Sequence, residues 1–413
     1  MVMHDIVIVG GGPAGMAAAV AAYDAGCKDV VIMDREPQIG GILMQCIHNG
    51  FGLHKLGKEL TGPEYAAVYE EKVRDRNILV YPETTVTSVT PEKVVTAQNR
   101  QGIMKIQAKA VILAMGCRER SRGALNICGS RPSGVYSAGT AQKLVNCMGY
   151  QVGKNVVILG SGDIGLIMAR RMSYEGAEVK AVCEVMPYSG GLTRNIVQCL
   201  EDFDIPLYLS TTVIQIHGKE RLEGVTIAQV DEKRQPIEET KRYIPCDTLL
   251  LSVGLIPENE LTRAAGIPID PITNGALVDE NCQTKVPGIF ACGNVLQVHD
   301  LVDYVSEEAE RAGLGAVKYI SGMQSSAVIE TKSGYGVRYV LPQTITTKDE
   351  DVSLFLRVTQ PFGKVKFSVM DGDQVLATTK KLKAAPGEME KITVKASALK
   401  NVTGPITVSL EVL

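Results

Sequence analysis

The chain has 413 residues, a length typical of two or three domains. With 45% hydrophobic residues, 22% charged residues and a formal net charge of −3, its composition is that of an ordinary globular protein. This charge balance argues against nucleic acid binding and against an acidic disordered chain. The 41 glycines, beside 6 phenylalanines and no tryptophan, favour tight turns or cofactor-binding loops over an aromatic-rich β protein.

An uncharged stretch at residues 6–23 approaches the length of a membrane span. However, Gly10-Gly11-Gly12-Pro13 interrupts it, and no signal-peptide pattern surrounds it. We therefore expect a strand, a turn and a helix, no membrane span and a cytoplasmic protein whose ten cysteines are reduced. None of these cysteines forms a CxxC pair, so we expect no metal site.

The first motif is Gly10-x-Gly12-x-x-Gly15, which follows a β-branched run and opens an apolar helix. Such glycines permit a tight turn, a close approach of the backbone to a pyrophosphate, and close packing of helix on strand. The helix N-terminus adds positive potential for phosphates. Asp34, which ends the next apolar run, can accept hydrogen bonds from ribose hydroxyls. The pattern predicts a dinucleotide-binding βαβ unit.

A second copy of this pattern begins at Asn155, with Gly160-x-Gly162-x-x-Gly165 and Glu184 as its acid. Glu184 would repel a 2′-phosphate and bind a free 2′-hydroxyl, which favours NADH over NADPH. The alternative is that this second unit serves as scaffold and binds no cofactor. Between the copies, residues 93–107 alternate like strands, and residues 109–115 read as a buried strand.

The chain ends in short alternating β runs from about Ser326 onward, with Asp371-Gly372 as a hairpin signal. Their spacing without helices predicts a small β-sandwich, which we interpret as a structural or assembly module. The expected fold is α/β, with two Rossmann-like three-layer dinucleotide-binding domains, the second inserted in the first, and a C-terminal all-β sandwich. The expected domains are residues 1–118 with 276–322, residues 119–275, and residues 326–413.

Five motifs in order carry a family resemblance: Asp34, Gly40-Gly41, Ala114-Met115-Gly116, Gly254-Leu255-Ile256-Pro257, and residues 284–294 (TKVPGIFACGN). Over residues 4–322 the chain resembles the pyridine nucleotide–disulfide oxidoreductase fold. The resemblance implies FAD on the first unit and NAD(P)H on the second. It assigns Gly293 and Asn294 to the ribityl chain and flavin phosphate, although the family usually has Asp at the latter position. The implied cofactor-binding residues are Gly10, Gly12, Pro13, Ala14, Gly15, Asp34, Arg35, Gly41, Val86, Ala114, Gly116, Gly293, Asn294, Leu301 and Val302 for FAD, and Gly160, Gly162, Asp163, Ile164, Glu184 and Gly254 for the nicotinamide nucleotide.

The cysteines depart from the dithiol branches of this family. Residues 136–149 hold only Cys147 and residues 40–52 hold only Cys46, so a dithiol reductase is not expected. The resemblance places Cys46 on a helix beside the flavin, where it could be a reactive thiolate, with His48 as a possible support. The alternative is an inert small side chain, and we interpret the other cysteines as core residues.

After Asn294, the resemblance implies that a helix directs its N-terminus, near Leu301 and Val302, at the flavin pyrimidine ring. His299 and Asp303 are candidates for substrate or partner contact, with capping or solvation as the alternative. The stretches IGGILMQCIHNGFG, SGVYSAGTAQKLVN and FACGNVLQVHDLVDYVSEEAERAG are similar to the FAD- and NAD-binding subunits that accompany amine, opine or glycerol 3-phosphate dehydrogenases.

The sequence thus predicts an FAD-dependent NADH oxidoreductase that exchanges electrons with a partner dehydrogenase subunit or small redox protein. Glycerol 3-phosphate dehydrogenase is one such partner, and a homo-oligomer is also conceivable. One competing hypothesis is a Cys46-based NADH peroxidase or disulfide reductase. Another, of a different class, is a flavin scaffold or redox sensor without turnover.

Overall fold

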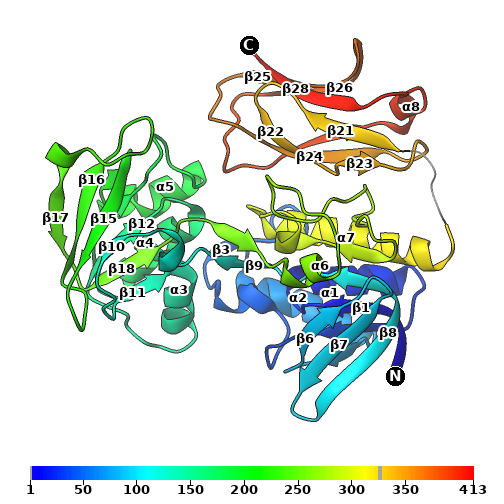
Figure 1. Ribbon diagram of the computed structural model, residues 1–413, viewed down its shortest axis with the longest axis horizontal. Helices are drawn as coiled ribbons and strands as arrows, with labels where there is room; N and C mark the ends of the chain where they lie inside the picture. The colour runs from blue at the N-terminus through cyan, green and yellow to red at the C-terminus, as the bar shows by residue number, and fades with distance from the viewer. Residues whose placement is uncertain (1, 324–327) are drawn as a thin grey trace. The chain divides into compact units, whose positions relative to one another are not determined.

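A computed structural model describes residues 2–323 and 328–413, and the chain divides into two compact units. Unit 1 comprises Met1–Cys117 and Pro257–Leu413, and unit 2 comprises Arg118–Ile256 (Figure 1). Residues 257–275, which the sequence analysis grouped with the second dinucleotide-binding domain, therefore belong to unit 1. The reason is local packing: the Asn259 amide donates to the carbonyl oxygens of Asn274 and Val295, and Ala265 lies in the unit 1 core. The expected module boundary at Ser326 lies outside the described residues.

Unit 1 is built around one mixed sheet in the order β5-β2-β1-β8-β7-β6, with β20 also paired to β8. Strand β1 runs parallel to β2 and β8, and Val9 is in register with Met33 and Leu113. The carboxyl ends of these three strands therefore meet at one edge, where Rossmann-type folds bind ligands. The strands are β1 (Val2–Val9), β2 (Val30–Met33), β5 (Leu79–Tyr81), β6 (Thr85–Val89), β7 (Val94–Asn99), β8 (Gly102–Leu113) and β20 (Ile289–Ala291).

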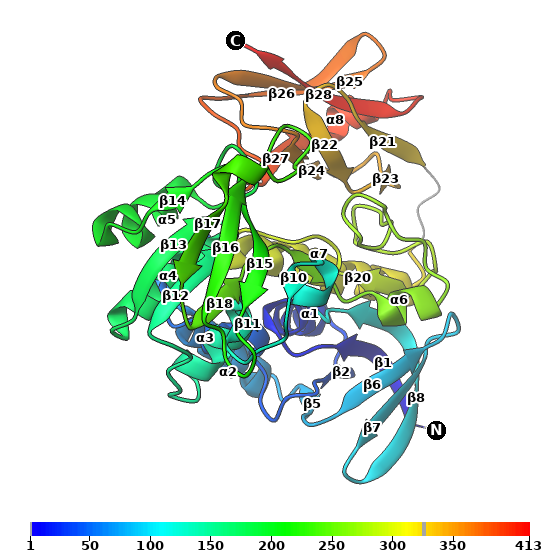
Figure 2. The same ribbon diagram turned by 60° about the vertical axis from the view of Figure 1, so that its left-hand side comes forward.

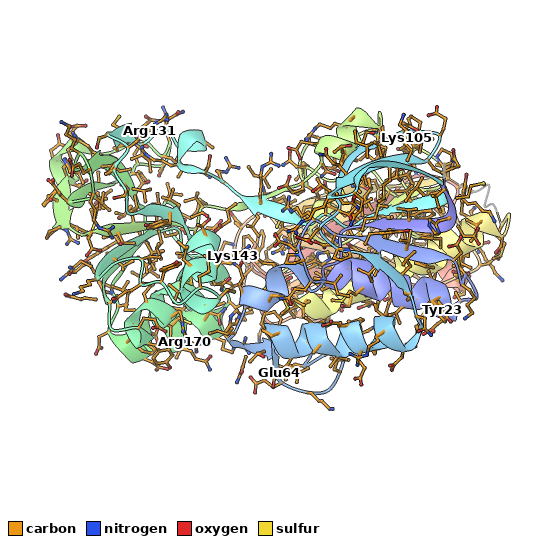
Figure 3. The ribbon with its side chains drawn as sticks, turned by 90° about the horizontal axis from the view of Figure 1, so that it is seen from below. Tyr23, Glu64, Lys105, Arg131, Lys143 and Arg170 are labelled. Carbon is orange, nitrogen blue, oxygen red and sulfur yellow. The ribbon has the colours of Figure 1, made fainter. Side chains whose placement is uncertain are left out.

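Three long helices accompany this sheet: α1 (Pro13–Asp24), α2 (Gly62–Asp75) and α7 (Val302–Ile320). Helices α1 and α7 cross closely, because a Cβ on Gly313 would lie 2.4 Å from the Ala18 carbonyl oxygen. Helix α2 begins with a capping box, in which the Thr61 hydroxyl and the Glu64 carboxylate bind each other's backbone N–H groups. Figure 3 labels Glu64 at this start and Tyr23 at the far end of α1.

Unit 2 repeats the Rossmann pattern in a parallel sheet of order β11-β18-β12-β13-β14, beside a second sheet of order β10-β15-β16-β17 (Figure 2). Strands β12 and β18 are almost entirely buried, as expected for a parallel sheet covered on both faces, and β13 becomes buried after Lys180. The elements are β10 (Cys128–Gly129), β11 (Val135–Ser137), α3 (Ala138–Asn146), β12 (Asn155–Leu159), α4 (Asp163–Tyr174), β13 (Glu178–Cys183), α5 (Thr193–Cys199), β14 (Leu207–Tyr208), β15 (Thr211–His217), β16 (Gly224–Gln229), β17 (Arg242–Pro245) and β18 (Thr248–Leu251).

The C-terminal β region, which we call the β module (residues 328–413), consists of two sheets, β23-β21-β28-β25-β26 and β22-β24-β27. Buried side chains of both sheets share one hydrophobic core, so the predicted sandwich is confirmed. The hairpin signal is also confirmed, since Asp371 pairs with Gln374 across the turn. The elements are β21 (Ile329–Ser333), β22 (Val337–Leu341), β23 (Thr344–Ile345), β24 (Val352–Val358), β25 (Val365–Asp371), β26 (Gln374–Lys381), β27 (Glu390–Val394), the short helix α8 (Ala396–Leu399), which the strand pattern did not predict, and β28 (Ile406–Val412).

The remaining elements are short. They are the 3₁₀ turns η1 (Gly41–Gln45), η2 (Arg122–Ala124), η3 (Glu201–Phe203), η4 (Glu238–Thr240) and η5 (Gly293–Val295), the strands β3 (Asn49–Phe51), β4 (Leu60–Thr61), β9 (Cys117–Glu119) and β19 (Leu255–Pro257), and helix α6 (Glu260–Ala264). Within the described part of the chain, no helix combines the length and apolar character that crossing a bilayer demands.

Candidate functional site

The glycine loop of unit 1 joins the end of β1 to α1 and leaves one side open. Gly10 has φ +107°, and a Cβ there would lie 2.4 Å from the Ala114 carbonyl oxygen. A Cβ on Gly15 would lie 1.8 Å from the Gly10 carbonyl oxygen, so both positions require glycine. By contrast, the nearest atom to a Cβ on Gly12 is 4.0 Å away. Only glycine closes this turn, and the space beside Gly12 fits a ligand's phosphates.

Helix α1 starts at Pro13, with Gly12 as its N-cap and no side chain capping its first turn. Its N–H groups and dipole are therefore available to an anion at this end of the helix. Ala14 lies in the first turn, and Gly293 approaches it so closely that a Cβ on Gly293 would be 2.7 Å from the Ala14 Cβ. The predicted cofactor residues of the glycine loop thus lie beside Gly293, which begins the segment 293–300 that we call the return segment.

Asp34 follows β2 at the same edge of the sheet and is buried, with 8% of its surface exposed. Its carboxylate accepts hydrogen bonds from the backbone N–H of Gly11 at 2.5 Å and of Glu36 at 2.8 Å. These bonds orient the acid beside the glycine loop, where a ribose would extend from the phosphates. The Asp34 carbonyl accepts from the Thr84 N–H, which brings the start of β6, and hence Val86, next to this acid.

Arg35 and Val86 differ in their surroundings. Val86 is half-buried against the core of unit 1. Arg35 is exposed and lines an open surface hollow together with Thr85, Gln98 and Arg100. Both residues flank the Asp34 side of the site.

The double glycine closes over the first loop. The Gly40 N–H donates to the Gly11 carbonyl oxygen at 2.8 Å, and both Gly40 and Gly41 have positive φ. A Cβ on Gly41 would lie 3.0 Å from the Gly12 Cα, so the two glycine segments are in direct contact. The sequence signal for Gly41 thus corresponds to a close backbone approach at positive φ, which favours glycine.

Cys46 does not lie on a helix, so that expectation was wrong. The chain after Gly40 forms the short 3₁₀ turn η1, and Cys46 is its C-cap. The turn ends there because the Gly62 N–H binds the Cys46 carbonyl oxygen at 2.8 Å and connects it to the start of α2. The Cys46 thiol donates to the Ile42 carbonyl oxygen at 3.3 Å, while the His48 ring packs against Phe51 at 5.1 Å between centroids.

The return segment brings Asn294 beside a second thiol. The Asn294 amide oxygen accepts from the His299 N–H at 3.0 Å, and its nitrogen lies 3.5 Å from the Cys117 sulfur. Cys117 follows Gly116, which has φ +74°, and is partly exposed. The interpretation of the remaining cysteines as core residues is therefore wrong for Cys117 and for the exposed Cys128 and Cys147.

Glu308 on α7 is a residue that the sequence reasoning missed. It is 1% exposed, and its carboxylate accepts from the Gly293 N–H at 2.8 Å and from the Gln297 amide at 2.7 Å. The His299 ring nitrogen lies 3.4 Å from it. Burial raises the pKa of the Glu308 carboxyl, but His299 and the hydrogen bonds outweigh this and hold the pKa below its usual value. By accepting the Gly293 N–H, the Glu308 carboxylate thus fixes the backbone of the loop at Gly293.

The side chains of His299 and Asp303 are both buried, so neither is presented at the surface of unit 1. The Asp303 carboxylate accepts from the N–H groups of Gly52 and Lys55, at 3.3 and 2.9 Å. Asp303 therefore holds the loop after Cys46 against the first turn of α7, next to Val302. Leu301 is the N-cap of that helix, and no side chain caps its first turn.

The glycine loop of unit 2 has the same construction. Gly160 has φ +101°, and a Cβ there would lie 2.0 Å from the Ser252 carbonyl oxygen. A Cβ on Gly165 would lie 2.5 Å from the Gly160 carbonyl oxygen, whereas the nearest atom to one on Gly162 is 4.0 Å away. Gly254 has φ +103° and open space around its Cβ position. This loop also fits a pyrophosphate.

Glu184, the acid of unit 2, is buried and held by three hydrogen bonds. It accepts from the Ser161 N–H at 2.9 Å, the Ser161 hydroxyl at 2.7 Å and the Met186 N–H at 2.9 Å. Asp163 begins α4, but its carboxylate accepts from the Leu192 N–H and the Asn195 amide. The Asp163 side chain therefore holds the loop that ends at Leu192. Ile164 packs against the unit 2 core.

That following loop contains a second double glycine, Gly190-Gly191, which the sequence reasoning also missed. The Gly190 N–H donates to the Ser161 hydroxyl at 3.1 Å, and a Cβ on Gly191 would lie 2.9 Å from the Ser161 carbonyl oxygen. The signal was present: Pro187, Gly190 and Gly191 each follow their counterparts Pro37, Gly40 and Gly41 by 150 residues, as Gly160 follows Gly10 and Glu184 follows Asp34. The internal repeat thus extends through the second glycine pair. Among the described residues, no group of three or more His, Cys, Asp or Glu side chains is placed to hold a metal ion.

Comparison with known proteins agrees with this construction. A family model described as "Pyridine nucleotide-disulphide oxidoreductase" matches residues 4–313. The chain is similar to the mitochondrial dihydrolipoyl dehydrogenase of Caenorhabditis elegans (27% identity, covering 77% of this chain and 68% of that protein). It is also similar to a protein named as one subunit of the opine oxidase of Agrobacterium tumefaciens strain Ach5 (24% identity, 82% and 70%). The solved thioredoxin reductase of T. acidophilum shares the fold over 78% of this chain and all of that one, with 24% identity and a TM-score of 0.65.

Proposed function

The chain belongs to the pyridine nucleotide-disulphide oxidoreductase family and is an oxidoreductase of the FAD- and NAD(P)-binding type; from this premise we propose that it transfers reducing equivalents between NADH and a bound FAD, and exchanges them with a partner protein. The observation that carries the proposal is the duplication: each unit has a closed glycine turn, an open phosphate position and an oriented acid. Two dinucleotides, one per unit, are what such a duplication can bind.

We assign FAD to unit 1. Gly12, Pro13 and Ala14 would face its pyrophosphate, and Asp34 its adenosine ribose. Gly293 and Asn294 would contact the ribityl chain and flavin phosphate, because Gly293 lies beside Ala14 and Asn294 follows it in the chain. The amide of Asn294 can bind a hydroxyl although the family usually has a carboxylate there. Leu301 and Val302, at the uncapped start of α7, would direct N–H groups and the helix dipole at the flavin ring.

We assign NADH to unit 2, with Gly162 beside the pyrophosphate. Glu184 decides the preference over NADPH, because a buried carboxylate held by three donors repels a 2′-phosphate and accepts a hydrogen bond from a free 2′-hydroxyl. When bound, the flavin supplies hydride chemistry. The protein's contribution is to hold the nucleotides, to exclude water and to stabilise negative charge with the N-terminus of α7.

The proposed electron partner is a dehydrogenase subunit or a small redox protein. Two observations support it. The chain is similar to two proteins named as subunits of opine oxidases, which are by name parts of a larger enzyme. In addition, the segments 40–52 and 136–149 each contain one cysteine, so the chain lacks the paired thiols of a dithiol relay there. A glycerol 3-phosphate dehydrogenase is a candidate within this class.

The decisive experiment is anaerobic stopped-flow absorbance of the FAD-loaded protein mixed with NADH or, separately, with NADPH. We expect rapid bleaching of the flavin band with NADH and bleaching at least about tenfold slower with NADPH, since a repelled 2′-phosphate costs more than about 1.4 kcal/mol. Equal rates would contradict the assignment of Glu184. No bleaching by either nucleotide, with FAD bound, would leave a flavin scaffold or redox sensor as the better interpretation.

A further inference from the structure

The β module contacts the proposed flavin site through a buried chain of hydrogen bonds. The hydroxyl of Tyr339, on β22, donates to the Gln297 side-chain oxygen at 3.2 Å. The Gln297 nitrogen donates to Glu308 at 2.7 Å, and Glu308 accepts from the Gly293 N–H at 2.8 Å. Gln297 and Glu308 are each 1% exposed, and Tyr339 is 8% exposed. A side chain of the module is thus connected, through two others, to the backbone of the loop assigned to the flavin phosphate.

A second set of contacts ties the module to the segment that follows this loop. The Arg357 guanidinium, on β24, donates to the Val298 carbonyl oxygen at 3.0 Å and lies 3.5 Å from the Asp300 carboxylate. Asp300 also accepts from the Met389 N–H at 3.2 Å. The module therefore supplies partners for the Gln297 side-chain oxygen, the Val298 carbonyl oxygen and the Asp300 carboxylate, and this segment leads directly into the first turn of α7.

The module also lies along α7 itself (Figure 1). Lys391 pairs with Glu307, Arg311 stacks over the Phe355 ring at 4.7 Å, and Lys318 binds Glu350 at 2.8 Å. These contacts differ from the buried chain of hydrogen bonds because they touch neither Gly293 nor residues 297–300. They provide the means to separate docking of the module from an effect on the flavin loop.

We propose that Tyr339 is a positioning residue for the flavin, acting through Gln297 and Glu308 on Gly293, so that the β module is part of the FAD-binding machinery as well as a structural domain. This inference rests on the assignment of FAD to unit 1. The physical reason is that a buried amide such as Gln297 has few orientations, and the Tyr339 hydroxyl selects the one that directs its nitrogen at Glu308. With that donor removed, the Gln297 oxygen is buried without this partner, and the amide is free to turn away from Glu308.

The test compares Tyr339→Phe in the full-length chain with two controls. Tyr335→Phe makes the same chemical change on a side chain of the module that is 70% exposed. Glu350→Gln breaks the ion pair with Lys318 and so weakens docking of the module away from residues 293–300. The FAD dissociation constant is measured by titrating apoprotein with FAD and following flavin fluorescence. The visible absorption spectrum and the midpoint potential of the bound flavin are recorded for each variant.

We expect Tyr339→Phe to raise the FAD dissociation constant by roughly threefold to tenfold, the effect of one buried hydrogen bond, and to shift the flavin spectrum and potential. Both controls should match the wild type in all three measurements. Wild-type affinity, spectrum and potential in Tyr339→Phe would overturn the inference, as would an equal loss of affinity in Glu350→Gln, which would indicate a general effect of docking. Should the wild-type apoprotein itself not bind FAD, the proposed function fails instead.

Discussion

The two glycine loops share one design and differ at its centre. Gly11 lies between the first two glycines of unit 1, where a Cβ would be 2.6 Å from the Ile39 side chain and 2.9 Å from the Asp34 carboxylate. Ser161 occupies the matching position in unit 2, and its hydroxyl donates to Glu184 and accepts from the Gly190 N–H. The acid in unit 2 is one methylene longer, and the serine occupies the space between this acid and the second double glycine.

This difference teaches how one scaffold can be adapted to two nucleotides. In unit 1, to which we assign FAD, the loop contacts the double glycine and the acid directly, through the Gly11 carbonyl oxygen and the Gly11 N–H. In unit 2, to which we assign NADH, the Ser161 hydroxyl bridges Glu184 and the second double glycine and adds a third hydrogen bond to this acid. This extra bond supports the proposed role of Glu184 in recognising a ribose hydroxyl.

The largest effect is expected from the matched pair Gly12→Ala and Gly162→Ala. Both Cβ positions are open within the protein, so the fold should tolerate them, but each added methyl would occupy the space assigned to a pyrophosphate. We expect Gly12→Ala to weaken FAD binding by about a hundredfold, and Gly162→Ala to retain FAD while its KM for NADH rises by a similar factor. Flavin content and steady-state kinetics measure the two effects. The reverse pattern would exchange the two assignments.

A substitution at Asp279, in unit 1, should change the stability of that unit while unit 2 serves as the reference. Burial raises the pKa of this unit 1 carboxyl to about 6 from its usual 3.8. The folded state therefore binds the proton more tightly than the unfolded chain, and stability falls as the pH rises from about 4 to about 6 and stays lower above that. Asp279→Asn removes the charge and keeps the oxygen that accepts from the N–H groups of Asn281 and Gln283.

We expect Asp279→Asn to raise the free energy of unfolding at pH 7 by about 2 kcal/mol, with little change at pH 4. Chemical denaturation at both pH values measures the difference, and amide hydrogen exchange should place the gain in unit 1 rather than unit 2. A gain of the same size at both pH values would show that folding does not raise the pKa of the Asp279 carboxyl.

A smaller effect is expected from Ser161→Gly, which gives the unit 2 loop the central residue of unit 1. The loss of one hydrogen bond to Glu184, about 1 kcal/mol, should raise the KM for NADH roughly fivefold with kcat unchanged and narrow the preference over NADPH. Ser189→Ala is the matched control, because that hydroxyl donates to the Ser161 carbonyl and does not touch Glu184. An unchanged preference in Ser161→Gly would mean that the hydroxyl has no part in selecting the nucleotide.

The smallest effect is expected from Cys46→Ser in the loop of unit 1. A serine hydroxyl can donate to the Ile42 carbonyl as the thiol does, so NADH-to-dye activity should stay within about twofold of the wild type. Cys147→Ser, at an exposed thiol of unit 2, is the control. Loss of NADH-dependent peroxide or disulfide turnover in Cys46→Ser alone would favour the thiol-based alternative over electron transfer to a partner.

The sequence by itself predicted the glycine turns, the two acids after the second strand of each βαβ unit and the sandwich of the β module, but not the short strands β3, β4, β9, β10 and β14. These features depend on local sterics and short-range periodicity, which a linear pattern records: a turn at φ near +100° with a carbonyl oxygen about 2 Å from the missing Cβ admits glycine alone. The 150-residue repeat also includes Gly190-Gly191, but only the structure shows that this pair contacts the glycine loop, through Ser161.

Only the tertiary structure decided the roles of Glu308, Asp303 and Tyr339. Each looks in sequence like an ordinary residue of an amphipathic helix or strand. Each is buried against a segment distant in the chain: Glu308 binds the loop at Gly293, Asp303 binds the loop at Gly52, and Tyr339 binds Gln297. A buried polar group must find a partner, but which partner it finds depends on how helices and sheets pack, and no local pattern contains that information. The 3₁₀ turn at Cys46 has the same cause, since the contact between Cys46 and Gly62 ends it.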